Sequence, residues 1–291
     1  MKPVLLATAV IAALTTAAMA APKAKAPAKP AAAAAKSSGP GPADWRTPDP
    51  NDVMVIDTNK GRILVELVPE IAPLSVARVR ELTHEHFYDG LRFFRVIDNF
   101  MDQTGDPQNS GTGGSDKPNV PGEFMFKRAA DSPFVLVDDQ GVAENGFIKS
   151  VPVSTQSWQL SAMTNDHAVK GWAYYCPGVA GLARDDNPDS NNSQFFLMRA
   201  SHHNLEKRYT AFGRVIAGQD VVRAIKTGEP VEAPQDRMER VRLLADLPPA
   251  ERPKVRVIDP KSAWFKAEVA RVKQASPNEY MCDVELPAEV K

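Results

Sequence analysis

The sequence predicts a mainly β protein whose central domain is a closed or nearly closed antiparallel barrel. Many short β-rich runs, turn signals at close intervals and only two helices among them are typical of such barrels. The chain has 291 residues, of which 43% are hydrophobic and 24% charged, as in soluble globular proteins. Its 35 Lys and Arg residues balance 36 Asp and Glu residues, so we expect no nucleic-acid partner.

The residues that precede the barrel predict export. Lys2 gives a basic start, residues 4–14 form an apolar run, and Ala18-Met19-Ala20 has the small-residue pattern of a cleavage site. We therefore expect a signal peptide over residues 1–20 and a periplasmic protein. The apolar run is shorter than the roughly 20 residues that cross a bilayer, so no stable membrane span is expected after cleavage. The Ala/Pro/Lys-rich residues 21–45 predict a flexible linker.

The barrel is expected to begin with a hairpin and a helix. Residues 53–58 and 62–67 are β-rich and are joined by Asn59-Lys60-Gly61, a polar turn with glycine where positive φ is required. Residues 73–85 follow, with proline in the first turn. Four apolar residues in this segment lie close to helical spacing, and they are Leu74, Val76, Val79 and Leu82.

The remaining elements of the barrel alternate with loops rich in Gly, Asn, Asp and Ser. Residues 93–107 predict two short strands about a turn, and residues 111–114 predict a glycine-rich loop. Further strands are predicted at residues 181–184, 194–198, 210–216 and 239–245, and a second helix at residues 219–226.

Two segments do not follow the barrel pattern. Residues 127–172 predict an insertion, with a strand near residues 135–137 and a short helical piece over residues 158–167. Residues 247–291 form a C-terminal extension. Within it, Phe265, Val269 and Val272 share one face of a helix over residues 262–273, which we expect to pack on the outside of the barrel.

The chain has two cysteines, Cys176 and Cys282. A disulfide between them suits an exported protein, but two free thiols are equally compatible with so distant a spacing. This spacing excludes a zinc knuckle.

The chain carries no common pattern for a nucleophile or a metal, and we expect neither a metal nor a cofactor. There is no G-x-S-x-G and no H-E-x-x-H. One unusual residue is Arg95, which lies in an apolar strand. Because side chains alternate along a strand, Arg95, Met101 and Gln103 share a face if the turn between them preserves the register. A surface ion pair of Arg95 with Asp98 or Asp102 is the alternative interpretation.

The stretch F-x-R-V-I-x-x-F-M-x-Q-x-G-D, from Phe93 to Asp106, resembles the central signature of the cyclophilin peptidyl-prolyl isomerases. The resemblance continues through residues 111–114, 178–184, 192–196 and 209–215, and it covers about residues 52–246. It implies a closed, eight-stranded barrel capped by two helices, here assigned to residues 46–246. Together with the predicted signal peptide, it indicates an exported, bacterial-like member of the family, with the insertion and the C-terminal extension as additions.

The resemblance further implies a groove on the outer face of the barrel, with Arg95 as the catalytic residue. Phe100, Met101, Phe196 and Leu205 would form the proline pocket, Gln103 would hold the peptide backbone, and Ala183 with the backbone of Arg184 would pair with the residues before proline. Gly111 and Gln194 would line the groove, and Tyr209 stands where the family usually has histidine. Asn204 stands where members that bind cyclosporin tightly usually have tryptophan, so weak cyclosporin binding is expected.

The expected reaction is rotation about X-Pro bonds in unfolded or flexible exported proteins. Rotation breaks amide resonance against a barrier of about 18–20 kcal/mol, and the twisted transition state gives the prolyl nitrogen a lone pair that an arginine can bind. The alternative function is a non-catalytic module that holds proline-containing segments, as a chaperone or scaffold of the cell envelope.

Overall fold

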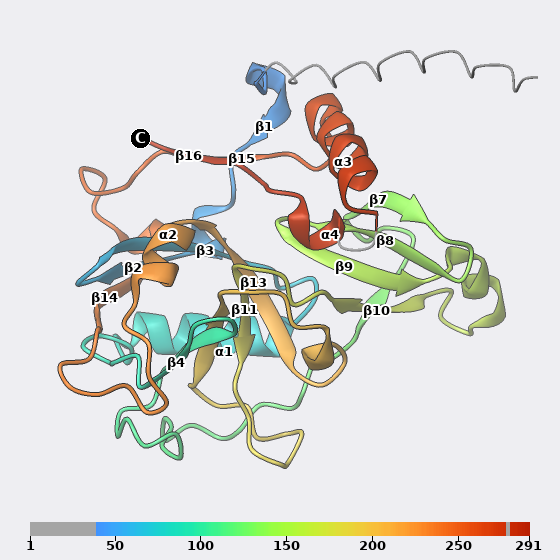
Figure 1. The fold of residues 1–291 in the computed structure, drawn as a ribbon. Coiled ribbons are helices and arrows are strands. Elements are labelled where there is room, and N and C mark those ends of the chain that lie inside the picture. Colours follow the sequence, from blue (N-terminus) through green and yellow to red (C-terminus); the bar gives the residue numbers. More distant parts are fainter. Residues whose placement is uncertain (1–38, 278–279) are drawn as a thin grey trace, which may run out of the picture. The chain divides into compact units, whose positions relative to one another are not determined.

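A computed structural model describes residues 39–277 and 280–291 (Figure 1). The predicted signal peptide and most of the predicted linker lie outside the described residues. Within the described chain, the strands form three sheets with eight, five and three members. No helix in residues 39–277 or 280–291 is long and apolar enough to cross a membrane.

The eight-stranded sheet is antiparallel throughout and has the order β14-β2-β3-β13-β11-β12-β5-β4. It curls into a half-barrel with β14 and β4 at its edges. Beyond these edges, Arg92 forms an isolated bridge with Arg237, and Val96 forms one with Gly228. The strands are β2 Val53–Thr58, β3 Gly61–Leu67, β4 Arg95–Ile97, β5 Met101–Thr104, β11 Val179–Leu182, β12 Phe195–Met198, β13 Thr210–Ala217 and β14 Met238–Leu243.

Both predicted helices of this domain are confirmed, as α1 Pro73–His84 and α2 Gln219–Ala224. Helix α1 buries Val76, Val79 and Leu82 and packs on β13 and β14, whereas Leu74 is 53% exposed and takes no part in the core. Its N-terminus has no capping side chain of its own. Instead, the Glu123 carboxylate accepts hydrogen bonds from two N–H groups of the first turn, so residue 123 replaces the missing cap.

The core of this domain is one apolar cluster that includes side chains from the eight-stranded sheet and both helices. Phe195 lies at its centre, with edge-to-face ring contacts to Tyr88 and Phe212 at 5.4 and 6.1 Å between centroids. Nearly all side chains of β2, β3, β11, β12 and β13 are buried, so burial on both faces of the sheet explains why these short apolar runs become strands.

The predicted insertion folds into the five-stranded sheet, with the order β6-β10-β9-β8-β7. The expected strand near residues 135–137 is confirmed within β7, and the expected helical piece is a 3₁₀-helix, η3 Trp158–Met163. The sequence did not predict the other four strands, and in β8 and β9 buried polar residues interrupt the apolar pattern. Glu144, for example, lies inside β8 and is neutralised there by Arg128 at 2.6 Å. The strands are β6 Phe126–Arg128, β7 Phe134–Asp139, β8 Ala143–Ile148, β9 Val151–Gln156 and β10 Val169–Ala173.

The three-stranded sheet joins the two ends of the described chain, because β15 Val255–Ile258 pairs with both β1 Trp45–Arg46 and β16 Ala288–Val290. The last residues of the predicted linker form the 3₁₀-helix η1 Pro42–Asp44 and the first residue of β1. The other short helices are η2 Pro50–Asp52, η4 His203–Leu205, η5 Leu244–Asp246 and α4 Tyr280–Asp283.

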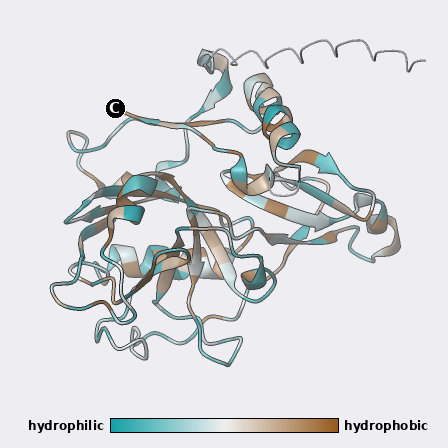
Figure 2. Cartoon of the chain, viewed as in Figure 1, coloured by the Kyte–Doolittle hydropathy of each residue, from teal (hydrophilic) through white to brown (hydrophobic). Residues whose placement is uncertain are grey.

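The predicted C-terminal helix is confirmed as α3 Ala263–Ala275, but its expected partner was wrong. The buried face of α3 contacts the inserted sheet and β15, not the outside of the barrel, and Phe265 meets Phe147 of β8 edge to face at 5.1 Å. Figure 1 shows α3 beside β7 and β8, and in Figure 2 the helix carries both hydrophobic and hydrophilic colouring, as expected when one face is buried.

The structure also decides between the two interpretations of the cysteines. Cys176 and Cys282 form a disulfide across a sequence separation of 106 residues. Cys176 belongs to the core cluster of the eight-stranded sheet, and Cys282 lies in α4 of the C-terminal extension. The bond therefore fixes the extension to the sheet that carries the predicted site residues.

Candidate active site

Arg95 lies on β4 directly opposite Gln103 on β5. The Nε of its guanidinium group donates to Oε1 of Glu229 at 2.6 Å, and Nη1 donates to Oε1 of Gln103 at 3.2 Å. The side chain is 35% exposed. Arg95 is therefore held in one orientation by two partners while it remains accessible from solvent.

The alternative pairing of Arg95 with Asp98 or Asp102 is wrong, because both carboxylates contact Arg199 at 3.0 Å. Arg199 and Asp102 are buried behind β5, and Arg199 also donates to backbone carbonyl groups near the end of α2. Burial raises the pKa of the Asp102 carboxyl, and the Arg199 guanidinium opposes that rise. This pair ties α2 to the strand on which Met101 and Gln103 lie.

A chain of amide hydrogen bonds connects Arg95 with the glycine-rich loop. Gln103 donates from Nε2 to Oε1 of Gln194 at 2.9 Å. Gln194 in turn donates from Nε2 to the carbonyl oxygens of Gly111 and Gly113, at 3.0 and 2.7 Å. The structure thus brings together four predicted site residues from β4, β5, the glycine-rich loop and the start of β12.

The glycine-rich loop is fixed by Asp106. Its carboxylate accepts hydrogen bonds from the N–H groups of Gln108, Ser110, Gly111 and Gly113 at distances from 2.7 to 3.2 Å. Gly111 has φ of 84°, and a Cβ at Gly113 would overlap the Asp106 carboxylate. Burial raises the pKa of Asp106, but the N–H donors lower it more, so the net pKa lies below its ordinary value.

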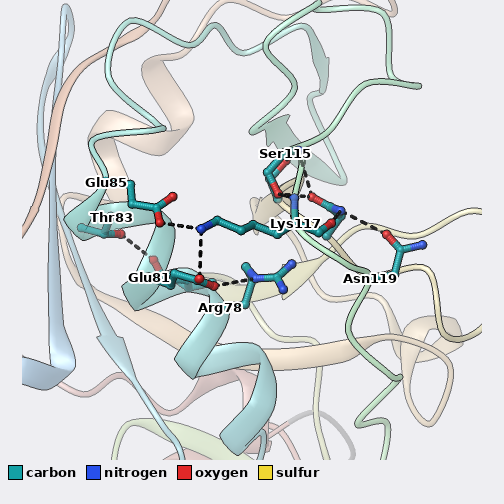
Figure 3. A network of polar contacts seen from close by, with 10 residues as sticks. Arg78, Glu81, Thr83, Glu85, Ser115, Lys117 and Asn119 are labelled. Carbon is teal, nitrogen blue, oxygen red and sulfur yellow. Dashed lines mark hydrogen bonds and ion pairs between the residues drawn. The ribbon is translucent and has the colours of Figure 1, made fainter.

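A second network holds the chain that follows this loop (Figure 3). Lys117 contacts Glu85 at 2.6 Å and Glu81 at 3.2 Å, and both acids lie at the C-terminal end of α1. Ser115 donates from its hydroxyl group to Oδ1 of Asn192 at 2.6 Å. The loop is therefore supported from α1 on one side and from the segment before β12 on the other.

The predicted apolar pocket residues lie in or against the core cluster. Met101, Phe196 and Leu205 are 2%, 5% and 6% exposed, and Phe100 and Tyr209 are partly buried beside them. Phe196 pairs with Gln103 across β12 and β5, so the apolar residues adjoin the amide chain. The sequence did not predict that the ring of Phe100 packs against His202, with 4.5 Å between centroids.

A cavity of about 410 Å³ lies next to this apolar group. Five predicted site residues line it, namely Gln103, Gly111, Ala183, Arg184 and Gln194, whereas Arg95 and the apolar residues do not. The Arg184 guanidinium lies 4.8 Å from the ring centre of Tyr209, and its Nε donates to the carbonyl oxygen of Arg208 at 2.9 Å. Arg184 therefore joins the cavity to Tyr209.

Most of the chain, including the candidate site, matches one protein family. The family described as "Cyclophilin type peptidyl-prolyl cis-trans isomerase/CLD" matches residues 53–244, which include every predicted site residue. The chain belongs to the cyclophilin family. It is a cyclophilin-type peptidyl-prolyl cis-trans isomerase.

Named relatives agree with this assignment. The cyclophilin is 31% identical over 195 residues to a probable peptidyl-prolyl cis-trans isomerase of Brucella suis, and the match covers 63% of this chain and 76% of the relative. It is 30% identical over 174 residues to peptidyl-prolyl cis-trans isomerase 10 of Caenorhabditis elegans, with 60% and 81% covered. Among solved structures, it resembles cyclophilin AquaCyp293 from Hirschia baltica at 32% identity, with a TM-score of 0.77 and coverage of 84% and 93%.

Glu229 is the main residue at this site that the sequence did not reveal. Val96 and Gly228 exchange two backbone hydrogen bonds of 2.8 Å, and this bridge places the next residue, Glu229, beside Arg95. Glu229 and Arg95 are 134 residues apart in sequence, so no local pattern connects them. In residues 39–277 and 280–291, no three His, Cys, Asp or Glu side chains gather as a metal site.

Asp106→Asn is predicted to destabilise the cyclophilin by about 2–3 kcal/mol, because an amide NH₂ cannot accept the N–H groups that the carboxylate oxygen binds. Because the pKa of Asp106 is lowered in the folded protein, the stabilisation by this carboxylate depends on pH. Stabilisation by ionised Asp106 is complete above its ordinary value of 3.8 and is lost as the pH falls through the lower folded-state pKa. Urea unfolding of the wild type and Asp106→Asn at several pH values measures the difference in their free energies of unfolding. This difference should become smaller below about pH 4.

Asp185→Asn is the matched control, since Asp185 is an exposed aspartate that lines the cavity beside the loop that Asp106 fixes. It should change the free energy of unfolding by less than about 0.5 kcal/mol. An equal loss in both variants would show that Asp106 has no special role in fixing the loop.

Proposed function

We propose that this cyclophilin is exported to the periplasm and isomerises X-Pro bonds in unfolded or flexible proteins there, with Arg95 as the catalytic residue. The observation that carries the assignment of Arg95 is its double restraint by Glu229 and Gln103 at an accessible position. A free surface arginine would have to lose rotamer freedom on binding, whereas Arg95 is already oriented.

The geometry leaves donors of Arg95 available for a substrate. Nε and Nη1 are engaged, but Nη2 makes no hydrogen bond to any residue in the described part of the chain. An N–H group of Arg95 can therefore donate to the prolyl nitrogen, which has a full lone pair when the amide is twisted and little basicity when it is planar. This bond is stronger in the transition state than in the ground state and so accelerates rotation.

The expected acceleration is modest in energetic terms. Uncatalysed rotation takes tens of seconds, and a millisecond turnover requires a factor of about 10⁴, or about 5–6 kcal/mol. One charge-assisted hydrogen bond and fixed positioning of the peptide supply energies of this order. Catalysis needs no nucleophile, because no covalent bond is made or broken.

The other predicted residues are assigned to binding. Phe100, Met101, Phe196 and Leu205 hold the pyrrolidine ring, and Gln103, Ala183 and the backbone of Arg184 hold the peptide on one side of it. Gly111 and Gln194 line the adjoining cavity, and Tyr209 closes the apolar group beside Phe196, with 6.0 Å between ring centroids. The bridges formed by Val96 and Arg92 support the further proposal that the sheet closes as a barrel, with this site on its outer face.

Arg95→Ala is predicted to lower kcat/KM for an X-Pro peptide by roughly 10²–10³-fold, while the peptide still binds. Exchange NMR on the peptide measures both rotation and binding. Arg237→Ala is the matched control, because Arg237 is an exposed arginine beside the other edge strand, β14, and pairs with Glu239. Unchanged rotation in Arg95→Ala would remove Arg95 from the mechanism, and binding without rotation in the wild type would favour the scaffold alternative.

Export is predicted to be visible in the mass and the thiols of the protein. The full chain, produced in a bacterium with two membranes, should be recovered from the periplasm without residues 1–20 and with no free thiol, because Cys176 and Cys282 are joined in an oxidising compartment. The same chain begun at Ala21 should stay in the cytoplasm with two free thiols. Recovery of both chains from the cytoplasm would contradict the proposed export.

Cyclosporin is predicted to bind weakly, and Asn204→Trp should tighten binding by about tenfold or more. Asn204 is exposed in η4, next to Leu205 of the apolar group, and an indole adds apolar area and an N–H donor there. Titration with the drug compares the wild type, Asn204→Trp and the control Asn204→Ala. Tight binding by the wild type, or equal affinities for all three, would be the contrary result.

A further inference from the structure

A second and larger cavity, of about 640 Å³, lies between β13, the start of α2 and the C-terminal extension. Residues 214–220 form one wall and residues 285–288 form the opposite wall, next to Cys282. None of its lining residues belongs to the proposed active site. Its volume is within the range of small-molecule sites. The second wall exists because the disulfide and β16 hold the extension close to β13.

A buried arginine without an acidic partner lies in this cavity. Arg214 is 8% exposed. Its Nε and Nη1 donate to the backbone carbonyl oxygens of Pro177 and Ser150, at 3.3 and 3.2 Å. No carboxylate of the described chain lies within 4.0 Å of its guanidinium nitrogens. A buried charge that no carboxylate pairs with directly is unfavourable, and an anion in the cavity would compensate it.

The electrostatic environment agrees with the geometry. Burial lowers the pKa of Arg214 to about 10, and the nearby Glu285 raises it only in part. At neutral pH the guanidinium group is therefore still protonated, and it remains only partly compensated. Glu285 is exposed on the opposite wall of the cavity and makes no ion pair with Arg214.

Two buried side-chain atoms of residues that line the cavity have no hydrogen-bond partner among the described residues, namely Oγ of Ser150 and Oε1 of Gln219, and both atoms are almost fully covered in this structure. Gln219 uses Nε2 to donate to the carbonyl oxygen of Met198 at 3.1 Å, so its oxygen is left as a free acceptor. Ser150 accepts Arg214 through its backbone oxygen, so its hydroxyl group is left as a free donor. Buried polar atoms are normally satisfied, which indicates a missing partner.

We propose that this cavity binds a small organic anion whose carboxylate pairs with Arg214 and whose hydroxyl or amino group donates to Gln219. The carboxylate accepts from the unused N–H groups of Arg214 and from the hydroxyl group of Ser150. Val215, Leu286 and Pro287 supply apolar contacts to the carbon skeleton. This binding site is separate from prolyl isomerisation and does not depend on the roles assigned to Arg95 and its neighbours.

The acidic residues of the cavity restrict the charge of the ligand. Asp220, Asp283 and Glu285 also line it, and because they outnumber the two arginines of the lining, Arg214 and Arg223, they repel a polyanion such as a nucleotide. The same carboxylates favour a ligand that carries hydrogen-bond donors away from its own carboxylate. A compact hydroxy acid therefore fits the donor and acceptor pattern better than phosphate does.

The test compares L-lactate, propionate and inorganic phosphate as probes of the full-length protein. Propionate is the matched probe, because it lacks only the hydroxyl group of lactate. Isothermal titration calorimetry should give a Kd for lactate below about 1 mM, with propionate at least about fivefold weaker and phosphate weaker still. Lactate should also raise the midpoint of thermal unfolding in a concentration-dependent manner. No binding of lactate, or equal binding of lactate and propionate, overturns the proposal.

Three variants locate the binding. Arg214→Gln should abolish lactate binding, and Arg240→Gln should leave it unchanged, since Arg240 pairs with Asp57 and Glu251 away from the cavity. Gln219→Leu should weaken lactate binding to the affinity of propionate without changing the affinity of propionate itself, and this comparison tests the proposal if Arg214→Gln does not fold. Isomerase activity serves as the check that each variant is folded. Full lactate binding by folded Arg214→Gln, or by Gln219→Leu, overturns the proposal.

Discussion

The antiparallel register of β4, β5 and β12 is the constraint on which the candidate active site depends. It sets Arg95 opposite Gln103, and Gln103 opposite Phe196. A slip of one residue in either pairing would turn the side chains of that strand to the other face of the sheet. The amide chain from Arg95 through Gln103 and Gln194 to the glycine-rich loop exists only in this register.

Three arginines of the cyclophilin show how environment decides the use of one residue type. Arg199 is buried, pairs with Asp102 and donates to several backbone carbonyl groups. These interactions join α2 to β5. Arg95 is partly exposed and is oriented by Glu229 and Gln103, so donors remain for a substrate. Arg214 is buried with hydrogen bonds to carbonyl oxygens, and no carboxylate pairs with it directly. The same guanidinium group thus serves structure and, as we propose, catalysis and anion binding.

The segments outside the eight-stranded sheet are integrated with one another. The insertion, the N-terminal strand β1 and the C-terminal extension share an apolar cluster around Phe147, Phe265 and Tyr280. The polar side of the same contact is an ion pair of Lys273 with Asp138 at 2.5 Å and a hydrogen bond from Tyr280 to Asp138 at 2.9 Å. The disulfide then fixes this assembly to the eight-stranded sheet, and the cavity of Arg214 lies along that junction.

The sequence by itself determined the elements of the eight-stranded sheet, both of its helices and the family, because alternating and helical periodicities and ordered local motifs are properties of neighbouring residues. It also placed Phe265, Val269 and Val272 on one helix face. Tertiary structure alone decided that this helix face packs on the inserted sheet and that Cys176 bonds to Cys282. It also decided that Glu229 orients Arg95 and that Arg214 has carbonyl partners but no paired carboxylate. Each of these joins residues far apart in the chain or depends on what surrounds a buried group, and such relations are fixed by packing of the whole chain and leave no local pattern.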